Sequence, residues 1–404
     1  MARAFVIVLD SVGIGGAPDA DAFFNDDLPD TGANTVGHIA QACATGRGDG
    51  AGRSGVLQLP HLARLGLGSA VRLASGADTP GLNVTPEGRW GAATEVSQGK
   101  DTPSGHWELA GAPATWDWHV FPRQTPAFPS DLSAAIARAA DTDGILGDCH
   151  ASGTEIIARL GAEHMQSGWP ICYTSVDSVL QIAAHEDRFG LDRLLSLCAE
   201  LAPRLHAMRV GRVIARPFTG DQGTGFVRTG HRRDFAMLPP APTLCDWVLE
   251  DGRDVHAVGK IGDIFSMRGI SDVRKGPDTE LMGHLDDLLS EAADGSLTFA
   301  NLVEFDSDYG HRRDVPGYAA ALERFDRWLG RALLCLRPGD MVLITADHGN
   351  DPTWVGTDHT RERVPVLVAG CGAGPLGQVA MVDVATSVAA HLGVASRGTG
   401  HSFL

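Results

Sequence analysis

The sequence predicts an α/β protein in which a mainly parallel sheet is flanked by helices. Strand-like and helix-like segments alternate along the chain, which is the pattern of repeated strand–helix–strand units. Several segments are short, continuous apolar runs, as expected of strands that are buried on both faces of a parallel sheet. We expect such strands at Ala4–Leu9, Leu302–Phe305, Met341–Thr345 and Val364–Val368.

Helical periodicity supports the same fold class. Apolar residues recur on one face from Tyr318 to Leu336, and Pro338-Gly339 then ends the pattern. A second amphipathic segment, from Ala380 to Leu392, predicts a closing helix.

The length of 404 residues predicts more than one domain, because a single core seldom grows past ~250–300 residues. Proline-containing stretches bracket a middle segment in which we expect strands at Ile171–Thr174 and Arg212–Ala215 and a helix at Asp192–Leu205. We predict a smaller α/β domain, residues 118–238, inserted between core segments 1–117 and 239–404.

Composition excludes several classes of protein. The formal net charge of -17 argues against nucleic-acid binding, so an anionic substrate would need local cations or bound metal. The apolar run near the N-terminus is too short for a signal or membrane segment. The seven cysteines are scattered and odd in number, which predicts reduced thiols. We expect a cytoplasmic protein that is monomeric or weakly oligomeric, with no membrane or nucleic-acid partner.

Three of the apolar runs end in an acid, at Asp10, Asp306 and Asp347. Ligands of open parallel sheets bind beyond the carboxyl ends of the strands, so these carboxylates should meet at one edge. Without partners they would repel one another and would be costly to desolvate. Bound divalent metal ions would hold them together.

Histidines follow two of these acids, at His311, His348 and His359. Three aspartates and three histidines exceed what one metal usually takes, and mixed carboxylate and imidazole ligands favour Mn or Zn over Ca. Any one of these residues alone is more simply a cap, a turn residue or a surface histidine, but six in such positions favour a two-metal site. Asp308 competes with Asp306 as a ligand, although the apolar run ends at Asp306.

The stretch "GKDTPSGHWE" predicts a helix that starts at Pro103, with Thr102 as its N-cap and Gly111 near its end. A hydroxyl there could simply cap the helix. It could also act as a nucleophile, since the positive helix end suits a phosphate and a metal ion can lower the pKa of the hydroxyl. Thr102 is favoured over Ser104, which lies inside the first turn. Two metals, a hydroxyl and a phosphate together predict metal-assisted phosphoryl transfer.

The motifs resemble the phosphopentomutase family of the alkaline phosphatase superfamily, which is related to the cofactor-independent phosphoglycerate mutases. The resemblance covers nearly the whole chain and rests on "VLDSVGIGGAPDA", "GKDTPSGHWELAG", "SVDSVLQIAAHE", "GRVIARPF", Phe305 to Asp314 and "TADHGNDPTWVGTDHTRERVPVL". It implies an alkaline-phosphatase-like core with an inserted cap domain. It also implies one manganese ion on Asp10, Thr102, Asp347 and His348, and another on Asp306, His311 and His359.

The resemblance further implies that ribose 1-phosphate and ribose 5-phosphate, or their 2-deoxy forms, are interconverted through a phosphorylated Thr102 and a sugar bisphosphate. Mg, Co or Zn could replace the two Mn²⁺ ions, and a sugar bisphosphate such as glucose 1,6-bisphosphate would be the activator. The implied substrate contacts are Ser175, Asp177, Val179, Arg212 and Ile214 of the cap, together with Lys260 of the core.

Other functions stay open at this point. A metal-dependent phosphatase or phosphodiesterase would pass the phosphoryl group to water, and a phosphoglycerate-mutase-like enzyme would act on a different substrate. The sizeable insertion favours a mutase, because a closed cap excludes water while an intermediate turns over. A non-catalytic metal-binding protein would not explain the hydroxyl beside the acids and histidines.

Overall fold

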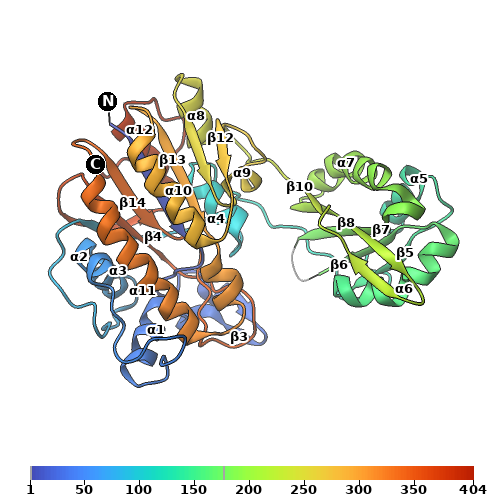
Figure 1. The fold of residues 1–404 in the computed structure, drawn as a ribbon, viewed down its shortest axis with the longest axis horizontal. Coiled ribbons are helices and arrows are strands. Elements are labelled where there is room, and N and C mark those ends of the chain that lie inside the picture. The colour runs from blue at the N-terminus through green and yellow to red at the C-terminus, as the bar shows by residue number, and fades with distance from the viewer. Residues whose placement is uncertain (1, 176–177) are drawn as a thin grey trace. The chain divides into compact units, whose positions relative to one another are not determined.

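A computed structural model describes residues 2–175 and 178–404, and the chain divides into two compact units (Figure 1). Unit 1 contains the residues up to Thr115 and those from Pro239 to Leu404, and unit 2 is Trp116–Leu238. Among the helices of the described residues, none combines the length and the apolar character that crossing a membrane requires.

Unit 1 is built on an eight-stranded sheet with the order β12-β11-β13-β1-β14-β15-β4-β16. β15 runs antiparallel to both of its neighbours, whereas every other neighbouring pair is parallel. The predicted mainly parallel sheet is therefore confirmed. The strands are β1 (Ala4–Leu9), β4 (Arg89–Thr94), β11 (Val255–Val258), β12 (Asp272–Arg274), β13 (Leu297–Leu302), β14 (Met341–Thr345), β15 (Val364–Ala369) and β16 (Gly374–Ala380).

Helices flank this sheet (Figure 1). Phe5 and Ile7 of β1 line a small cavity together with Leu285 of α10 and Trp328 of α11. On the other hand, α12 packs against β1, α4 and α8. The helices of unit 1 are α1 (Thr35–Ala44), α2 (Pro60–Leu65), α3 (Leu67–Ser75), α4 (Thr102–Leu109), α8 (Leu244–Glu250), α9 (Ile261–Ile264), α10 (Asp278–Glu291), α11 (Val315–Ala332) and α12 (Val382–Leu392).

The strand expected at Leu302–Phe305 was placed wrongly. β13 begins at Leu297 and ends at Leu302, in register with the whole of β1 from Ala4 to Leu9. Beyond the strand, the carboxylate of Asp278 accepts hydrogen bonds from the N–H groups of Val303 and Glu304, which turns the chain out of the sheet. Residues Phe305–Gly310 then form a π-helical turn that carries Asp306.

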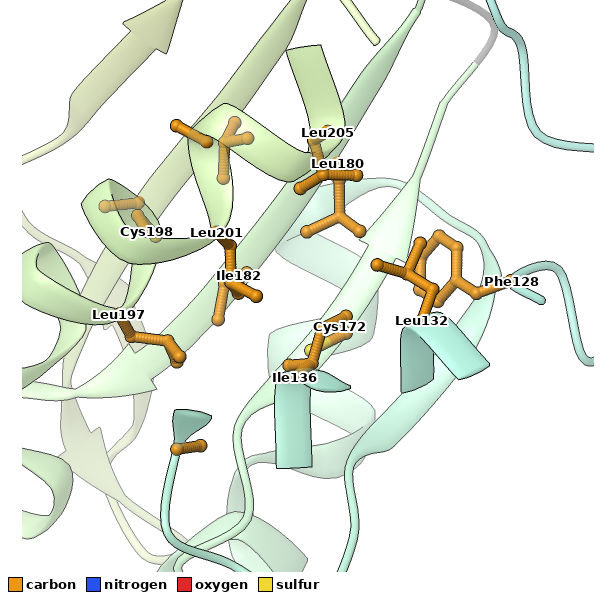
Figure 2. Close-up of a cluster of buried hydrophobic side chains, with 14 of the residues drawn as sticks. Phe128, Leu132, Ile136, Cys172, Leu180, Ile182, Leu197, Cys198, Leu201 and Leu205 are labelled. Atoms are coloured by element: carbon orange, nitrogen blue, oxygen red, sulfur yellow. The ribbon is translucent and has the colours of Figure 1, made fainter. Parts of the chain in front are cut away.

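Unit 2 contains a six-stranded sheet with the order β10-β8-β7-β6-β5, in which β9 pairs with β8. The helices α5 and α7 cover one face, where Leu180 and Ile182 of β7 pack against Leu132, Leu197 and other apolar side chains (Figure 2). The other face packs against α6. The elements are α5 (Ser130–Ala139), β5 (Leu146–His150), α6 (Gly153–Ser167), β6 (Ile171–Thr174), β7 (Val179–His185), α7 (Leu191–Ala207), β8 (Arg212–Asp221), β9 (Gly225–Arg228) and β10 (Arg233–Ala236).

Candidate active site

Three buried aspartates lie at the carboxyl ends of three adjacent parallel strands. Asp10 directly follows β1, Asp347 follows β14, and Asp306 lies in the turn after β13. β1 is the middle strand and pairs with both of the others. Parallel strands end at a common edge, which is where such sheets bind their ligands. The three carboxylates therefore meet at the ligand-binding edge of the sheet.

One candidate metal group is centred on His348. Its Nε2 lies 3.5 Å from Asp10 Oδ1 and 3.3 Å from Asp347 Oδ2. The hydroxyl oxygen of Thr102 lies 3.3 Å from the same nitrogen. These four side chains are the set predicted for the first metal ion, and the structure brings them together.

A second candidate metal group is centred on Asp306. Nε2 of His311 lies 3.1 Å from Asp306 Oδ2, and Nε2 of His359 lies 3.4 Å from Asp306 Oδ1. The rings of His348 and His359 have centroids only 4.0 Å apart. His348 can therefore serve with Asp10 and Asp347 or with Asp306 and His359, so the two groups are contiguous.

The chemistry of these groups fits divalent cations. Asp10 Oδ1 and Asp347 Oδ2 are buried, and neither has a hydrogen-bond partner among the described residues. Burial, together with the neighbouring Asp347 and Asp306, raises the pKa of Asp10 well above its ordinary value. Burial also lowers the pKa of His348 to about 4, so its imidazole is neutral and able to ligate. A bound cation would satisfy both carboxylate oxygens and remove their repulsion.

Backbone carbonyls fix the orientation of two of the histidines. His311 Nδ1 lies 2.6 Å from the Thr357 carbonyl oxygen, and His348 Nδ1 lies 3.1 Å from that of Gly349. A carbonyl oxygen only accepts, so Nδ1 carries the proton in both rings. In the neutral ring the lone pair is then on Nε2, the atom that faces the acids, as metal-ligating histidines require.

The predicted N-cap of α4 is wrong by one residue. Asp101, in an extended conformation, caps the helix by accepting a hydrogen bond from the Ser104 N–H at 3.1 Å. Thr102 is therefore the first helical residue, and Pro103 occupies the second position. A carboxylate fills the cap position, so the Thr102 hydroxyl is not needed for capping and lies beside His348 instead.

Two rival residues occupy other environments. The Ser104 hydroxyl is buried and donates to the capping carboxylate of Asp101 at 3.0 Å. Asp308 is half-buried and pairs with Arg312 at 3.0 Å, outside both metal groups. The geometry thus favours Thr102 as the nucleophile and Asp306 as the ligand.

Sequence reasoning missed the side chains that hold these groups in place. His106 is buried, and its Nδ1 lies 2.9 Å from the Thr102 carbonyl oxygen and 3.1 Å from Asp347 Oδ2. Asn301 Nδ2 lies 3.2 Å from His106 Nε2 and donates to Asp10 Oδ2 at 2.8 Å. A buried histidine and asparagine thus connect the helical turn that carries Thr102 to two carboxylates. The polar Asn301 inside the apolar run of β13 was the available sequence signal.

Gly105 explains how α4 approaches the strand edge so closely. A Cβ at this position would lie 2.2 Å from the Asp347 carbonyl oxygen, which no side chain permits. The absence of a side chain therefore lets the first turn of α4 reach Asp347. The glycine was visible in the motif, but its packing partner was not.

The predicted sugar-binding residues of unit 2 lie on two neighbouring strands. Val179 of β7 pairs with Arg212 of β8, and Ile214 lies two residues further on the same face. Val179 and Ile214 are buried within unit 2, whereas Arg212 and Ser175 are partly exposed. Asp177 lies outside the described residues.

Lys260 belongs to unit 1, where it precedes α9 as an exposed residue. Its positive charge lowers the pKa of Asp10, against the larger effects of burial and the neighbouring acids that raise it. The ammonium group is therefore within electrostatic reach of the metal-ligand set.

Several known proteins are similar to this chain. The metalloenzyme superfamily model matches residues 2–395. A phosphopentomutase of Methylobacterium sp. strain 4-46 is 58% identical, covering 98% of each chain, and one of Allorhizobium ampelinum is 56% identical over 100% of each. Among solved structures, PH0037 from Pyrococcus horikoshii matches with a TM-score of 0.48 at 13% identity, over 98% of each chain. The phosphoglycerate mutase of Leishmania mexicana matches with a TM-score of 0.45 at 14% identity, over 99% of this chain and 97% of that one.

The fold and site are those of a metalloenzyme with an alkaline-phosphatase-like core. The identity over full length shows that the chain belongs to the phosphopentomutase family. It is accordingly a metal-binding isomerase of the phosphotransferase type, as the resemblance of the motifs predicted.

Proposed function

We propose that this enzyme interconverts ribose 1-phosphate and ribose 5-phosphate, and the corresponding 2-deoxyribose phosphates. The observation that carries the proposal is the position of the Thr102 hydroxyl, 3.3 Å from the shared ligand His348 at the start of α4. The names of the relatives, all phosphopentomutases at 54–58% identity, support the pentose phosphate substrate.

Two divalent ions, which we propose to be Mn²⁺, would be held by this chain's own residues. Asp10, Asp347, His348 and the Thr102 oxygen would take one ion, and Asp306, His311 and His359 the other. Such ions supply charge neutralisation for both the attacking and the leaving oxygen of a phosphoryl transfer. Mg²⁺, Co²⁺ or Zn²⁺ are candidate substitutes, since carboxylate and imidazole ligands suit them all to some degree.

The reaction that we propose is a double transfer through Thr102. Phosphothreonine 102 gives its phosphoryl group to the free hydroxyl of the sugar phosphate. The bond from phosphorus to the Thr102 oxygen breaks, a bond to the sugar oxygen forms, and the hydroxyl proton passes to Thr102. In the second transfer the other phosphoryl group of the sugar bisphosphate moves to the Thr102 oxygen. Its bond to the sugar oxygen breaks, and that oxygen takes the proton that the Thr102 hydroxyl loses. A sugar bisphosphate such as glucose 1,6-bisphosphate would activate an unphosphorylated chain in the same way.

We also propose that unit 2 is the cap that supplies sugar contacts, through Ser175, Asp177, Val179, Arg212 and Ile214, while Lys260 of unit 1 faces a phosphate. Arginine offers a planar fork and lysine a point charge for phosphate oxygens, which supports this division. A cytoplasmic, monomeric or weakly oligomeric enzyme stays part of the proposal.

Phosphorus NMR tests the proposal directly. The chain is incubated with Mn²⁺, a trace of glucose 1,6-bisphosphate and ribose 5-phosphate. We expect ribose 1-phosphate to appear without free phosphate. Free phosphate alone would instead indicate a hydrolase that passes the phosphoryl group to water.

A further inference from the structure

Glu362 is a buried acid that lies close to the metal-ligand set, three residues after His359. Its Oε2 accepts hydrogen bonds from the backbone N–H groups of Gly15 at 3.0 Å and of Thr35 at 2.9 Å. Its Oε1 accepts hydrogen bonds from the hydroxyls of Thr35 and Thr360, both at 2.7 Å. Four donors from three segments of the chain therefore fix both oxygens of this carboxylate.

Glycines in the loops that follow β1 and β14 make room for this carboxylate. Gly13 follows Asp10 by three residues, and Gly349 comes directly after His348. A Cβ added to either glycine would overlap the carboxylate of Glu362. Because only glycine permits so close an approach, both loops can pack against the acid. The Glu362 carboxylate is thus packed between the two loops that begin at ligands of the first candidate metal group.

One series of hydrogen bonds connects Glu362 to the second candidate metal group through Thr35. The Thr35 hydroxyl donates to Glu362, and it accepts a hydrogen bond from the backbone N–H of Asn350 at 3.2 Å. The side-chain oxygen of Asn350 accepts from Arg313, so the amide nitrogen faces the other way and donates to Asp306 Oδ1 at 2.7 Å. Glu362 therefore helps to place Asn350, which in turn holds the carboxylate of Asp306.

A second series of hydrogen bonds connects Glu362 to the chain beside His359. The Thr360 hydroxyl donates to Glu362, and it accepts a hydrogen bond from the backbone N–H of Asp351 at 3.1 Å. The backbone of Thr360 also pairs with that of Gly349, through hydrogen bonds of 2.8 and 3.1 Å. These contacts fix the residue that follows His359, whose Nε2 faces the second candidate metal group. Both series of hydrogen bonds therefore lead to ligands of the same group.

We propose that Glu362 is a positioning residue that holds Asp306 and His359 at the spacing which the second metal ion requires. It acts through two threonine hydroxyls and is not itself a ligand. Side chains that hold the ligands of a metal in place contribute to its affinity, because the ion binds best to ligands already in its preferred geometry. This role rests on the proposed two-ion site, and it gives a function to a buried acid that the proposed reaction does not otherwise use.

The alternative is that Glu362 only stabilises the fold. Thr35 is the first residue of α1, and an acid at the N-terminus of a helix is stabilising whatever lies beyond it. Glu323 of α11 provides a matched control, because it is also a buried acid. Its Oε1 accepts hydrogen bonds from Arg53 Nε and from the Gln58 N–H, both at 3.1 Å. A loss of stability should follow the removal of either acid, whereas a loss of metal affinity should follow the removal of Glu362 alone.

Titration of the full chain with Mn²⁺ tests this role, with bound ions counted by electron paramagnetic resonance and affinities measured by calorimetry. Burial and the nearby Asp351 raise the pKa of Glu362 to about 7, so the titrations are made at about pH 8, where the carboxylate is ionised. Glu362→Gln keeps the shape of the side chain but replaces one acceptor oxygen by an N–H donor. The affinity for one of the two ions should fall about 10- to 100-fold, and the affinity for the other should change little. Glu323→Gln should leave both affinities unchanged, even if denaturant unfolding shows an equal loss of stability.

Two substitutions of Thr35 test the first series of hydrogen bonds without removing the acid. Thr35→Val removes the hydroxyl at nearly constant shape and should weaken binding of the same ion by about tenfold. Thr35→Ser keeps the hydroxyl and should retain most of the affinity. This pair keeps the test valid if Glu362→Gln does not fold, because a serine and a valine differ here in the hydroxyl that reaches Glu362 and Asn350.

The outcomes separate the positioning role from the proposed function. Unchanged affinities in Glu362→Gln, or equal losses of affinity in Glu362→Gln and Glu323→Gln, would overturn the role alone. Thr35→Ser binding as weakly as Thr35→Val would overturn it as well. An unsubstituted chain that binds a single Mn²⁺ ion would refute the proposed two-ion site together with the role. Mutase turnover is measured separately, so an inactive chain in which Glu362→Gln still weakens one ion supports the role and refutes the proposed reaction.

Discussion

The metal-ligand set of unit 1 and the sheet face of unit 2 that carries Arg216 and Arg228 are opposite in charge. In unit 1, Asp10 and Asp347 are fully buried, and each has an oxygen without a hydrogen-bond partner among the described residues. In unit 2, Arg216 is partly buried beside a neutral amide. A cation would relieve the repulsion among the acids of unit 1, whereas Arg216 already donates a hydrogen bond to Gln181. The net charge of -17 conceals this difference, so local charge rather than the chain's total defines what each unit binds.

The largest loss of activity should come from removing the Thr102 hydroxyl, which lies beside the metal-ligand set. Thr102→Val keeps the side-chain shape and should lower mutase turnover by at least about a thousandfold, as loss of a covalent nucleophile does. Metal affinity should change little, because the other ligands remain. Coupled-assay rates and Mn²⁺ titrations measure both. Ser104→Ala is the control, and if it were the inactive variant, Thr102 would not be the nucleophile.

The second largest loss of activity should come from replacing an acid of the metal-ligand set. Asp306→Asn should reduce the number of tightly bound Mn²⁺ ions from two to one, and turnover should fall by about a hundredfold or more because one clamp on the reacting phosphoryl group is lost. Electron paramagnetic resonance of titrated Mn²⁺ counts the ions. Asp308 lies two residues away and pairs with Arg312. Asp308→Asn should therefore leave both the number of bound Mn²⁺ ions and the turnover unchanged. Equal losses in the two variants would remove Asp306 from the ligand set.

His106 should show an intermediate effect, because it acts through other groups. His106→Gln loses the Nδ1 donor near Thr102 and Asp347, and metal affinity should fall about 10- to 100-fold, as is usual when a residue that orients a ligand is lost. His106→Asn places an amide N–H close to the position of Nδ1 and should recover most of that affinity. Calorimetric Mn²⁺ titration of both variants decides the matter, and equal losses would mean that His106 contributes only packing.

Stability without metal should show the repulsion among the acids. The folded pKa of Asp10 is raised, so its contribution to stability is present below the ordinary carboxyl pKa and is lost as the pH rises through the raised value. In EDTA at neutral pH, Asp10→Asn should therefore stabilise the chain by about 1–3 kcal/mol relative to the unsubstituted chain. With Mn²⁺ present the sign should reverse, because a ligand is missing. Denaturant unfolding measures both, and an unchanged sign would contradict a metal site at Asp10.

The smallest effect should come from unit 2. Arg212→Lys keeps the charge but loses the planar fork, so KM for ribose 5-phosphate should rise only a few-fold while kcat holds. Steady-state kinetics at fixed Mn²⁺ measure the change. A fall in kcat without a change in KM would show that Arg212 acts on the reaction rather than on substrate binding.

The sequence was most informative where one local pattern determines the structure. Apolar runs identified β1 and β14 with the correct bounds, so Asp10 and Asp347 were placed at the sheet edge. The sequence did not predict the bounds of β13, because pairing with β1 determines where this strand ends. The chain then turns because the Asp278 carboxylate, at the start of α10, accepts a hydrogen bond from Val303. The predicted N-cap of α4 was one residue too late because aspartate and threonine are both good N-caps. Only the backbone conformation shows that Asp101, and not Thr102, occupies the cap position.

Contacts between distant residues could not be read from the sequence. The approach of His106 to Asn301 joins residues that are 195 positions apart, and the meeting of Tyr173 with Gly153 depends on how α6 packs on its sheet. The arginines of unit 2 are individually ordinary surface residues. Only the strand register places Arg216 and Arg228 on one face of the sheet.

The connection between the units has a consequence for engineering. The chain leaves unit 1 after Thr115 and returns at Pro239, and close to these points the N–H of Leu244 donates to the Ala110 carbonyl oxygen at 2.8 Å. The two points of unit 1 between which unit 2 is inserted are thus already joined by a hydrogen bond. All eight strands of the unit 1 sheet lie outside residues 116–238. A short glycine-serine loop could replace unit 2 without threading or reordering any strand. The shortened chain would be a minimal metalloprotein on which the chemistry of the strand edge can be studied without unit 2.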